Sequence, residues 1–112
     1  MSDARQIAEI FTAYEKYGWQ LRRILLTAVL KARLGRDVTN LLAGAEVIDS
    51  DIDAAWFSRP PKPGGVAWEI RHLGEKPYAL LENIDENSQA FEEVIRDVED
   101  RLRESICRSK PA

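Results

Sequence analysis

The stretch from Asp49 to Ile84 decides the fold and reads DSDIDAAWFSRPPKPGGVAWEIRHLGEKPYALLENI. It contains three runs of β-prone side chains and two of the three tryptophans of the chain. Two segments rich in proline and glycine separate the runs, and such residues interrupt strand pairing. We therefore predict an antiparallel meander of three strands over Ile48–Ser58, Val66–Leu73 and Tyr78–Ile84.

The first two of these strands predict a register as well as a pairing. Side chains alternate between the two faces of a strand, so a hairpin can place Trp56 across from Trp68 on one face. The same register places Asp53 across from Arg71 on the other face. Aromatic pairs and pairs of opposite charge both stabilise neighbouring strands. We predict this register, with the tryptophan face buried in the core.

Helices are expected at both ends of the chain. Ser2 can cap the first helix, and Gly18 can end it. The last helix follows the capping cluster that ends at Ser88 and runs to about Cys107. Apolar side chains repeat at helical spacing in both segments and predict one buried stripe on each helix. These side chains are Ile7, Ile10, Phe11, Tyr14 and Tyr17 in the first helix, and Phe91, Val94, Ile95, Val98, Leu102 and Ile106 in the last.

The segment Trp19–Leu26 fits two structures. Its apolar spacing can continue the first helix as one long helix, but Gly18 interrupts that helix and Thr27 is a suitable cap for a new one. We predict a strand over Trp19–Leu26, followed by a short helix over Ala28–Leu34 that ends at Gly35. The long helix stays open as the alternative, because short apolar runs fit both structures.

Together these elements predict a single α+β domain over residues 1–112, in the order α-β-α-βββ-α. The sheet is antiparallel, has three to four strands and is flanked by the N- and C-terminal helices. A helical turn capped by Asp37 and closed by Gly44 joins the short helix to the meander. A chain of 112 residues can bury roughly two-thirds of its unfolded surface, which is enough for one core.

Composition limits the compartment and the partners. The net charge is −3, which argues against nucleic-acid binding, since that depends on excess Lys and Arg. Cys107 is the single cysteine, so no internal disulfide can form. The sequence has no recognisable signal peptide and no apolar run of about 18 residues. We predict a cytoplasmic protein without a membrane or nucleic-acid partner.

An acidic run opens the first strand of the meander. Asp49, Asp51 and Asp53 alternate and would line one strand face, where they could hold a hard cation. A calcium loop of the EF-hand kind needs glycine and glutamate where this chain has Ala54 and Pro60. A solvated strand face is therefore the favoured interpretation, with no cofactor, and metal binding stays open.

A nuclease-like enzyme is one alternative function. In it, Asp51, Asp53 and Glu69 would hold a metal ion that polarises a phosphate. Arg71 follows Glu69 at the position where such sites use lysine, and arginine does not readily transfer a proton. No other residue set in the sequence has the spacing of a catalytic motif, since His72 and Cys107 stand alone.

The function we predict is a non-enzymatic protein-interaction module that works as a homodimer. The sheet face opposite the tryptophans mixes charged and apolar side chains, as interfaces do. Its predicted interface residues are Phe57, Ala67, Leu73 and one of Leu80 and Leu81, with Ala55 beside them. The rival explanation is that the first helix, or the Trp19–Leu26 segment, covers this face within one chain. A chaperone or adaptor for another protein is a further alternative, based on small size, acidity and element order.

Overall fold

The computed structural model describes residues 4–35, 45–62, 65–73 and 79–108. In these residues the chain forms a five-stranded mixed sheet and three helices. The predicted cap at Ser2, the turn from Asp37 to Gly44 and the strand start at Tyr78 lie outside them. The elements are α1 (Ala4–Lys16), β1 (Gln20–Leu26), α2 (Ala28–Leu34), β2 (Glu46–Asp49), β3 (Ala54–Lys62), β4 (Gly65–His72), β5 (Ala79–Ile84) and α4 (Phe91–Arg108).

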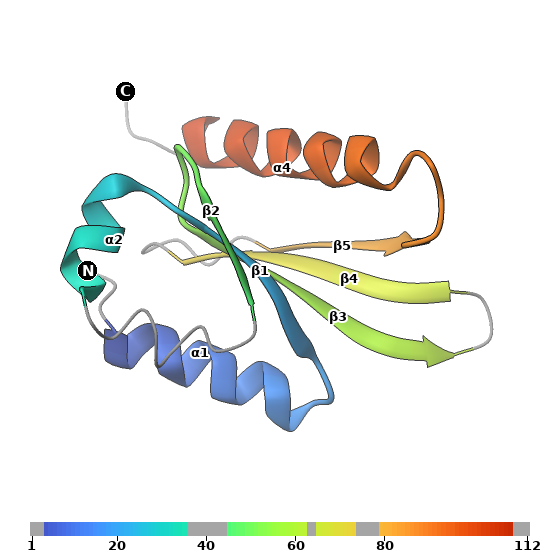
Figure 1. Ribbon diagram of the computed structural model, residues 1–112, viewed down its shortest axis with the longest axis horizontal. Helices are drawn as coiled ribbons and strands as arrows, with labels where there is room; N and C mark the ends of the chain where they lie inside the picture. The colour runs from blue at the N-terminus through green and yellow to red at the C-terminus, as the bar shows by residue number, and fades with distance from the viewer. Residues whose placement is uncertain (1–3, 36–44, 63–64, 74–78, 109–112) are drawn as a thin grey trace.

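The strands follow the spatial order β2-β1-β3-β4-β5 (Figure 1). The antiparallel meander β3-β4-β5 is confirmed, and so is its α+β setting. The prediction of a purely antiparallel sheet of three to four strands is wrong, because β2 adds a fifth strand that is parallel to β1. The chain crosses over through α2 between these two strands, and such a crossover returns the chain in the same direction.

The segment after Gly18 is a strand followed by a short helix, as predicted. Thr27 caps α2, because its hydroxyl accepts a hydrogen bond of 3.2 Å from the Leu30 N–H. Gly35 ends α2 with a φ of 50°. The alternative of one long N-terminal helix is therefore excluded.

The acidic run breaks the strand that was predicted over Ile48–Ser58. β2 ends at Asp49 and β3 begins at Ala54. The Asp53 carboxylate accepts hydrogen bonds from the Thr27 N–H at 2.8 Å and from the Thr27 hydroxyl at 3.3 Å. An aspartate that bonds to backbone in this way favours a turn over a strand, so the chain changes direction here.

The hairpin register differs from the predicted one by two residues. Trp56 pairs with Ile70, and Trp68 pairs with Ser58. Arg71 lies opposite Ala55 rather than Asp53, whose carboxylate is engaged with Thr27. A shift of two leaves every side chain on its predicted face, so the two indoles still meet, with ring centroids 6.1 Å apart.

The prolines do not end β3, which was expected to stop at Ser58. The strand continues to Lys62, which pairs with Gly65 of β4. The register is broken between Arg59 and Lys62, where two prolines lack the N–H that a ladder requires. Pairing therefore resumes beyond the prolines after an irregular step.

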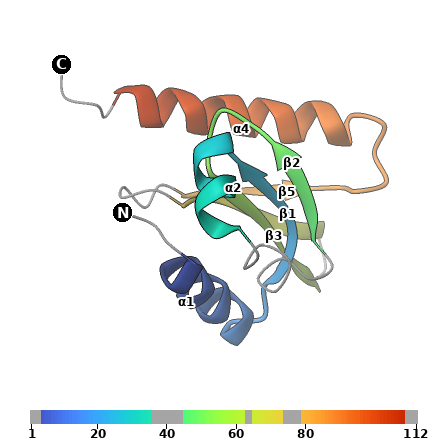
Figure 2. The same cartoon turned by 60° about the vertical axis from the view of Figure 1, so that its left-hand side comes forward.

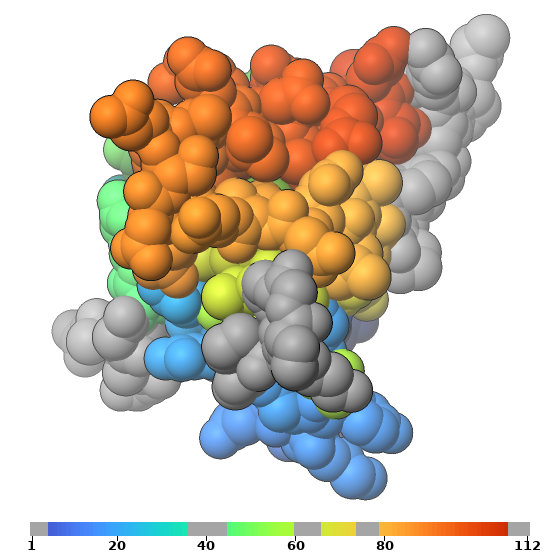
Figure 3. Space-filling model, turned by 90° about the vertical axis from the view of Figure 1, so that its right-hand side faces the viewer, coloured from blue at the N-terminus to red at the C-terminus, as the bar shows by residue number. Residues whose placement is uncertain are grey.

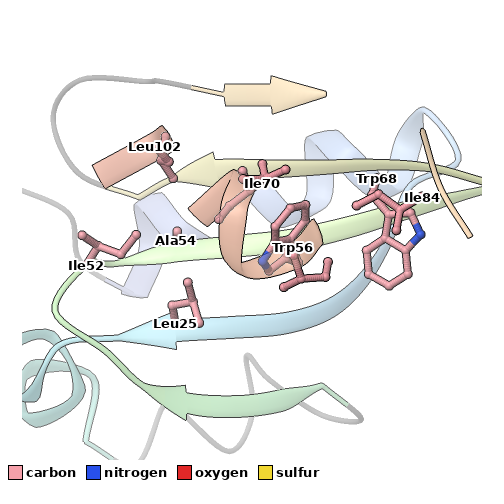
Figure 4. Close-up of a cluster of buried hydrophobic side chains, with 10 residues drawn as sticks. Leu25, Ile52, Ala54, Trp56, Trp68, Ile70, Ile84 and Leu102 are labelled. Carbon is pink, nitrogen blue, oxygen red and sulfur yellow. The ribbon is translucent and has the colours of Figure 1, made fainter. Parts of the chain in front are cut away.

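Helices pack on both faces of the sheet. Figure 1 shows α4 on one side of the sheet and α1 on the other, and Figure 2 shows α2 close to the sheet beside β1 and β2. The tryptophan face is buried in the core, as predicted, and it packs on α4; Figure 4 shows the core of that layer. Its buried residues are Leu25, Ile52, Ala54, Trp56, Trp68, Ile70, Ile84, Ile95, Val98 and Leu102.

The opposite face forms a second core, which contradicts the prediction of one buried face. Its buried residues are Ile7, Ile24, Leu26, Leu30, Leu34, Ala55, Phe57 and Leu73, drawn from α1, α2 and the sheet. The stripe of α1 supplies part of the cover, as the rival explanation expected. Tyr17 departs from that stripe, with 67% of its surface exposed.

A β-bulge in β1 sends two neighbouring arginines to the α4 side. The register shifts between Leu21 and Arg23, which pair with consecutive residues of β3. The Arg22 guanidinium lies 4.9 Å from the Trp68 ring centroid, and that of Arg23 lies 5.5 Å from the Phe91 ring centroid.

Among the helices that the structure describes, none combines the length and apolar character needed to cross a membrane.

Candidate functional site: a groove at the end of α1

The C-terminal end of α1 builds one wall of a groove. Gly18 has a φ of 88°, which residues other than glycine rarely adopt. The Trp19 N–H donates to the Tyr14 carbonyl at 3.0 Å, and the Gly18 N–H donates to the Glu15 carbonyl at 3.0 Å. This pair of bonds is a Schellman motif, which brings the residue after the glycine against the last helical turn. The rings of Tyr14 and Trp19 accordingly meet edge to face, with centroids 6.1 Å apart.

Strands β3 and β4 build the other wall. The groove has a volume of about 380 Å³ and is lined by Ala13, Tyr14, Tyr17, Trp19, Arg59 and Glu69. The Tyr14 ring stacks on Phe57 at 4.0 Å, and its hydroxyl donates a hydrogen bond to the Glu69 carboxylate. The position of Tyr14 is therefore fixed on both sides, by an aromatic ring of β3 and a carboxylate of β4.

Glu69 and Arg59, the two charged residues that line the groove, have different surroundings. Burial, followed by the hydrogen bond to the Glu69 carboxylate, raises the pKa of Tyr14 above its usual range. Tyr14 thus stays a neutral donor, and one Glu69 oxygen is occupied. The exposed Arg59 guanidinium lies 5.8 Å from the Trp19 ring centroid. No carboxylate of the described residues forms an ion pair with it.

Beyond the groove, the same sheet face is open over β5 and half-buried over β4. Leu81 lies on this face opposite Glu69, and 61% of its surface is exposed. In the described part of the chain, β5 pairs with β4 alone and so forms an edge of the sheet. Figure 3 shows atoms of β5 at the surface beneath α4. The open face and this strand edge therefore adjoin one another.

The predicted metal ligands are not brought together. The carboxylate of Asp51 pairs with Arg103 at 2.8 Å, that of Asp53 accepts from Thr27, and that of Glu69 accepts from Tyr14. The described residues contain no group of three or more His, Cys, Asp or Glu side chains placed to hold a metal ion.

The Arg103 pair lowers the pKa of Asp51, so that carboxyl stays charged at neutral pH. Asp49, the remaining member of the acidic run, pairs with Lys31 of α2 at 3.1 Å. The three aspartates also do not share a strand face, because the chain turns between Asp49 and Ala54. Asp49 and Asp53 instead contact α2 and its cap, and Asp51 contacts α4.

The predicted interface residues divide into three groups. Phe57 and Leu73 are buried in the core on the α1 side, with 1% and 0% of their surfaces exposed. Leu80 lies on the tryptophan face and packs against the core beneath α4. Ala67 and Leu81 lie on the open face, where they remain within reach of a partner.

Sequence reasoning missed the aromatic groove. The sequence patterns place Tyr14 and Tyr17 in the stripe of the first helix and Trp19 in a strand, and Arg59 lies directly after the predicted strand that ends at Ser58. The available signal was Gly18 with aromatic residues close on both sides, since a Schellman glycine brings such residues into contact. Glu69 was noted as a candidate ligand, but its partner lies 55 positions away in the chain.

Comparisons with protein-family models, with curated proteins and with solved structures found no match to this chain, so its function is inferred from the geometry described above.

Proposed function

We propose that this protein is a non-enzymatic interaction module that forms a homodimer through the free edge of β5. The observation that supports the proposal most is the exposure of Leu81 at 61% on that edge strand. The interface predicted from the sequence included Phe57 and Leu73. Because both are buried within one chain, the proposed contact moves to the neighbouring open face and keeps Ala67 and Leu81.

The two edges of the sheet differ in the features that keep edges from pairing. Short strands and charged side chains protect an edge. β2 has four residues and carries Glu46 and Asp49, so it has both features. β5 has six residues and one charge, Glu82, which forms an ion pair of 2.6 Å with Arg101 of α4. The less protected edge is therefore β5.

An antiparallel contact centred on Leu81 fits the side chains of β5. It places Leu81 beside Leu81 of the second copy, with Cβ atoms about 4.5–5.5 Å apart. Glu82 then lies opposite Leu80 rather than opposite another Glu82, which avoids a pair of like charges. The two five-stranded sheets become one continuous sheet, and the open faces of the two copies lie side by side.

Light scattering coupled to size-exclusion chromatography tests this proposal at micromolar concentrations. The expected mass is twice the 12.7 kDa of one chain. Leu81→Lys places a charge at the centre of the contact and should give the mass of one chain, with a circular dichroism spectrum like that of the parent.

Val47→Lys is the matched control, because Val47 lies on the opposite edge strand with 37% of its surface exposed. This variant should keep the mass of the parent protein. A parent protein with the mass of one chain would disprove the homodimer. A parent dimer that persists in Leu81→Lys would show that the contact lies away from β5.

A further inference from the structure

We propose that the groove at the end of α1 binds a carboxylate group carried on an aromatic or apolar body, with the carboxylate on Arg59 and the body against Tyr17 and Trp19. The inference does not depend on the homodimer, because the groove is lined by α1, the residues that follow it, β3 and β4, not by β5.

The apolar part of the ligand is suggested by the rings that remain accessible. Tyr17 has 67% of its surface exposed, and Trp19 is half-buried with its ring in the groove lining. Tyr14 is held in place by Phe57 and Glu69, so the floor of the groove is already ordered before a ligand enters. Such a preformed aromatic surface suits a flat or branched apolar group.

The charged part of the ligand is suggested by Arg59. Its guanidinium carries N–H donors in a planar fork that matches a carboxylate, and no described carboxylate occupies it. Contact with the Trp19 ring holds the guanidinium beside the groove. Arginine that lies on an aromatic ring keeps its N–H edge available for hydrogen bonds.

A cationic ligand is the competing choice, because aromatic rings with a carboxylate also bind cations. Here Arg59 already supplies a cation near the face of Trp19. One oxygen of the Glu69 carboxylate accepts a hydrogen bond from the Tyr14 hydroxyl. The charge of Arg71 lowers the pKa of Tyr14, although burial and Glu69 together raise that pKa by more. Of the two charged side chains that line the groove, Glu69 is engaged by Tyr14, whereas Arg59 has no carboxylate partner among the described residues, and this favours an anion.

The test uses phenylacetate, with phenylacetamide and phenethylamine as neutral and cationic probes of similar shape. The indole N–H signals in ¹H–¹⁵N spectra of the full chain separate Trp19 from the two buried tryptophans. Phenylacetate should shift the Trp19 signal, and added salt should weaken its binding. Phenylacetamide should bind about tenfold more weakly or worse, because it lacks the charge-assisted hydrogen bonds.

Two variants locate the site. Arg59→Gln removes the charge and should weaken phenylacetate binding by about tenfold, whereas Arg33→Gln on the exposed side of α2 should leave it unchanged. Tyr17→Ser removes an exposed ring and should also weaken binding. Unchanged thermal melting of both groove variants would exclude unfolding as the cause.

A second pair of probes distinguishes a protein partner from a small organic acid as the source of the carboxylate. A blocked Glu-Phe dipeptide is compared with the Gln-Phe form, and both are compared with phenylacetate. Tighter binding of Glu-Phe supports the site with a protein partner, and tighter binding of phenylacetate supports it with a small organic acid. Equal binding of phenylacetate and phenylacetamide, preference for phenethylamine, or no shift of the Trp19 signal would overturn the proposal.

Discussion

At the scale of single residues, two buried indoles have different polar surroundings. The Trp56 Nε1 donates to the Glu99 carboxylate at 2.8 Å, whereas the buried Trp68 Nε1 has no hydrogen-bond partner among the described residues. Glu99→Ala should lower the free energy of unfolding by about 1–3 kcal/mol, because it leaves a second buried donor without an acceptor. Urea denaturation measures this change.

Glu99→Gln is the matched variant, since its amide oxygen can still accept from Trp56. It should retain most of the stability that Glu99→Ala loses. If the two substitutions cost the same, the hydrogen bond to Trp56 does not contribute to stability.

Gly18 allows a second prediction at this scale. Its φ of 88° is costly for a residue with a Cβ, so Gly18→Ala should destabilise the protein by about 1–2 kcal/mol. A Cβ built at Gly18 would lie 3.8 Å from the Arg59 Nε, which is an ordinary contact, so the cost comes from the backbone. Gly18→Asn should cost less, because asparagine adopts positive φ more readily than alanine does. Thermal melts of the two variants would refute this if both were as stable as the parent.

The residue patterns predicted the faces of the meander correctly and its exact pairing incorrectly. Alternation assigned Trp56 and Trp68 to the core face, and a shift of two preserved that assignment. The pairing of Asp53 depended on Thr27, which is 26 positions away, and hairpin charges alone cannot reveal such a contact. The groove escaped prediction for the same reason, because Tyr14 meets Glu69 only after the chain has folded.

At the scale of elements, α4 is joined to the sheet by its apolar stripe and by ion pairs near each end. Glu92 pairs with Arg23 of β1 at 2.8 Å, and Arg103 pairs with Asp51 at 2.8 Å. Hydrogen bonds from these arginines lower the pKa values of Glu92 and Asp51 below their ordinary values. A carboxyl whose pKa is lowered on folding stabilises the folded state above its unfolded pKa, and this contribution is lost as the pH falls through the folded value.

We therefore expect acid to weaken the attachment of α4. The melting temperature should fall as the pH drops below about 4, the ordinary pKa of Asp and Glu in an unfolded chain, and it should fall less in a variant with both Asp51→Asn and Glu92→Gln. Glu93→Gln, at an exposed position of the same helix, serves as the control and should follow the parent. Identical pH profiles for the parent and the double variant would show that these pairs contribute nothing.

The elements that begin or end at a capping residue or a glycine were the easiest to predict. α2 begins after Thr27 and ends at Gly35, and α1 ends before Gly18, so local backbone chemistry determines where these helices begin and end. The parallel position of β2 was missed because the predicted strand over Ile48–Ser58 ran through the acidic run, although aspartate is depleted in strands. Its location beside β1 depends on the crossover through α2, which is a tertiary contact.

At the scale of the whole molecule, the sheet is buried on both faces at its centre and open at its edges. β1 and β3 lie between other strands and between two helical layers, so their amides should exchange with solvent most slowly. Native-state hydrogen exchange of Ile24, Leu25, Trp56 and Phe57 provides the measurement. Faster exchange at these residues than at α4 would contradict the two-layer core.

The same experiment reports on β5. Half of the amides of an edge strand point away from its neighbour and should exchange rapidly in a single chain. In a homodimer joined through β5, these amides should become protected as protein concentration rises. Protection that does not change with concentration would argue against that contact.

The placement of β2 outside β1, rather than between β1 and β3, has a consequence for the order in which the chain folds. β1 and β3 can pair before β2 arrives, because the α2–β2 segment attaches to the far side of β1. We expect this segment to add late, so Ile48→Ala, which removes the β2 side chain that packs against the core, should speed unfolding and leave the folding rate nearly unchanged. Stopped-flow kinetics decide this: a matching decrease in the folding rate would place β2 in the folding nucleus.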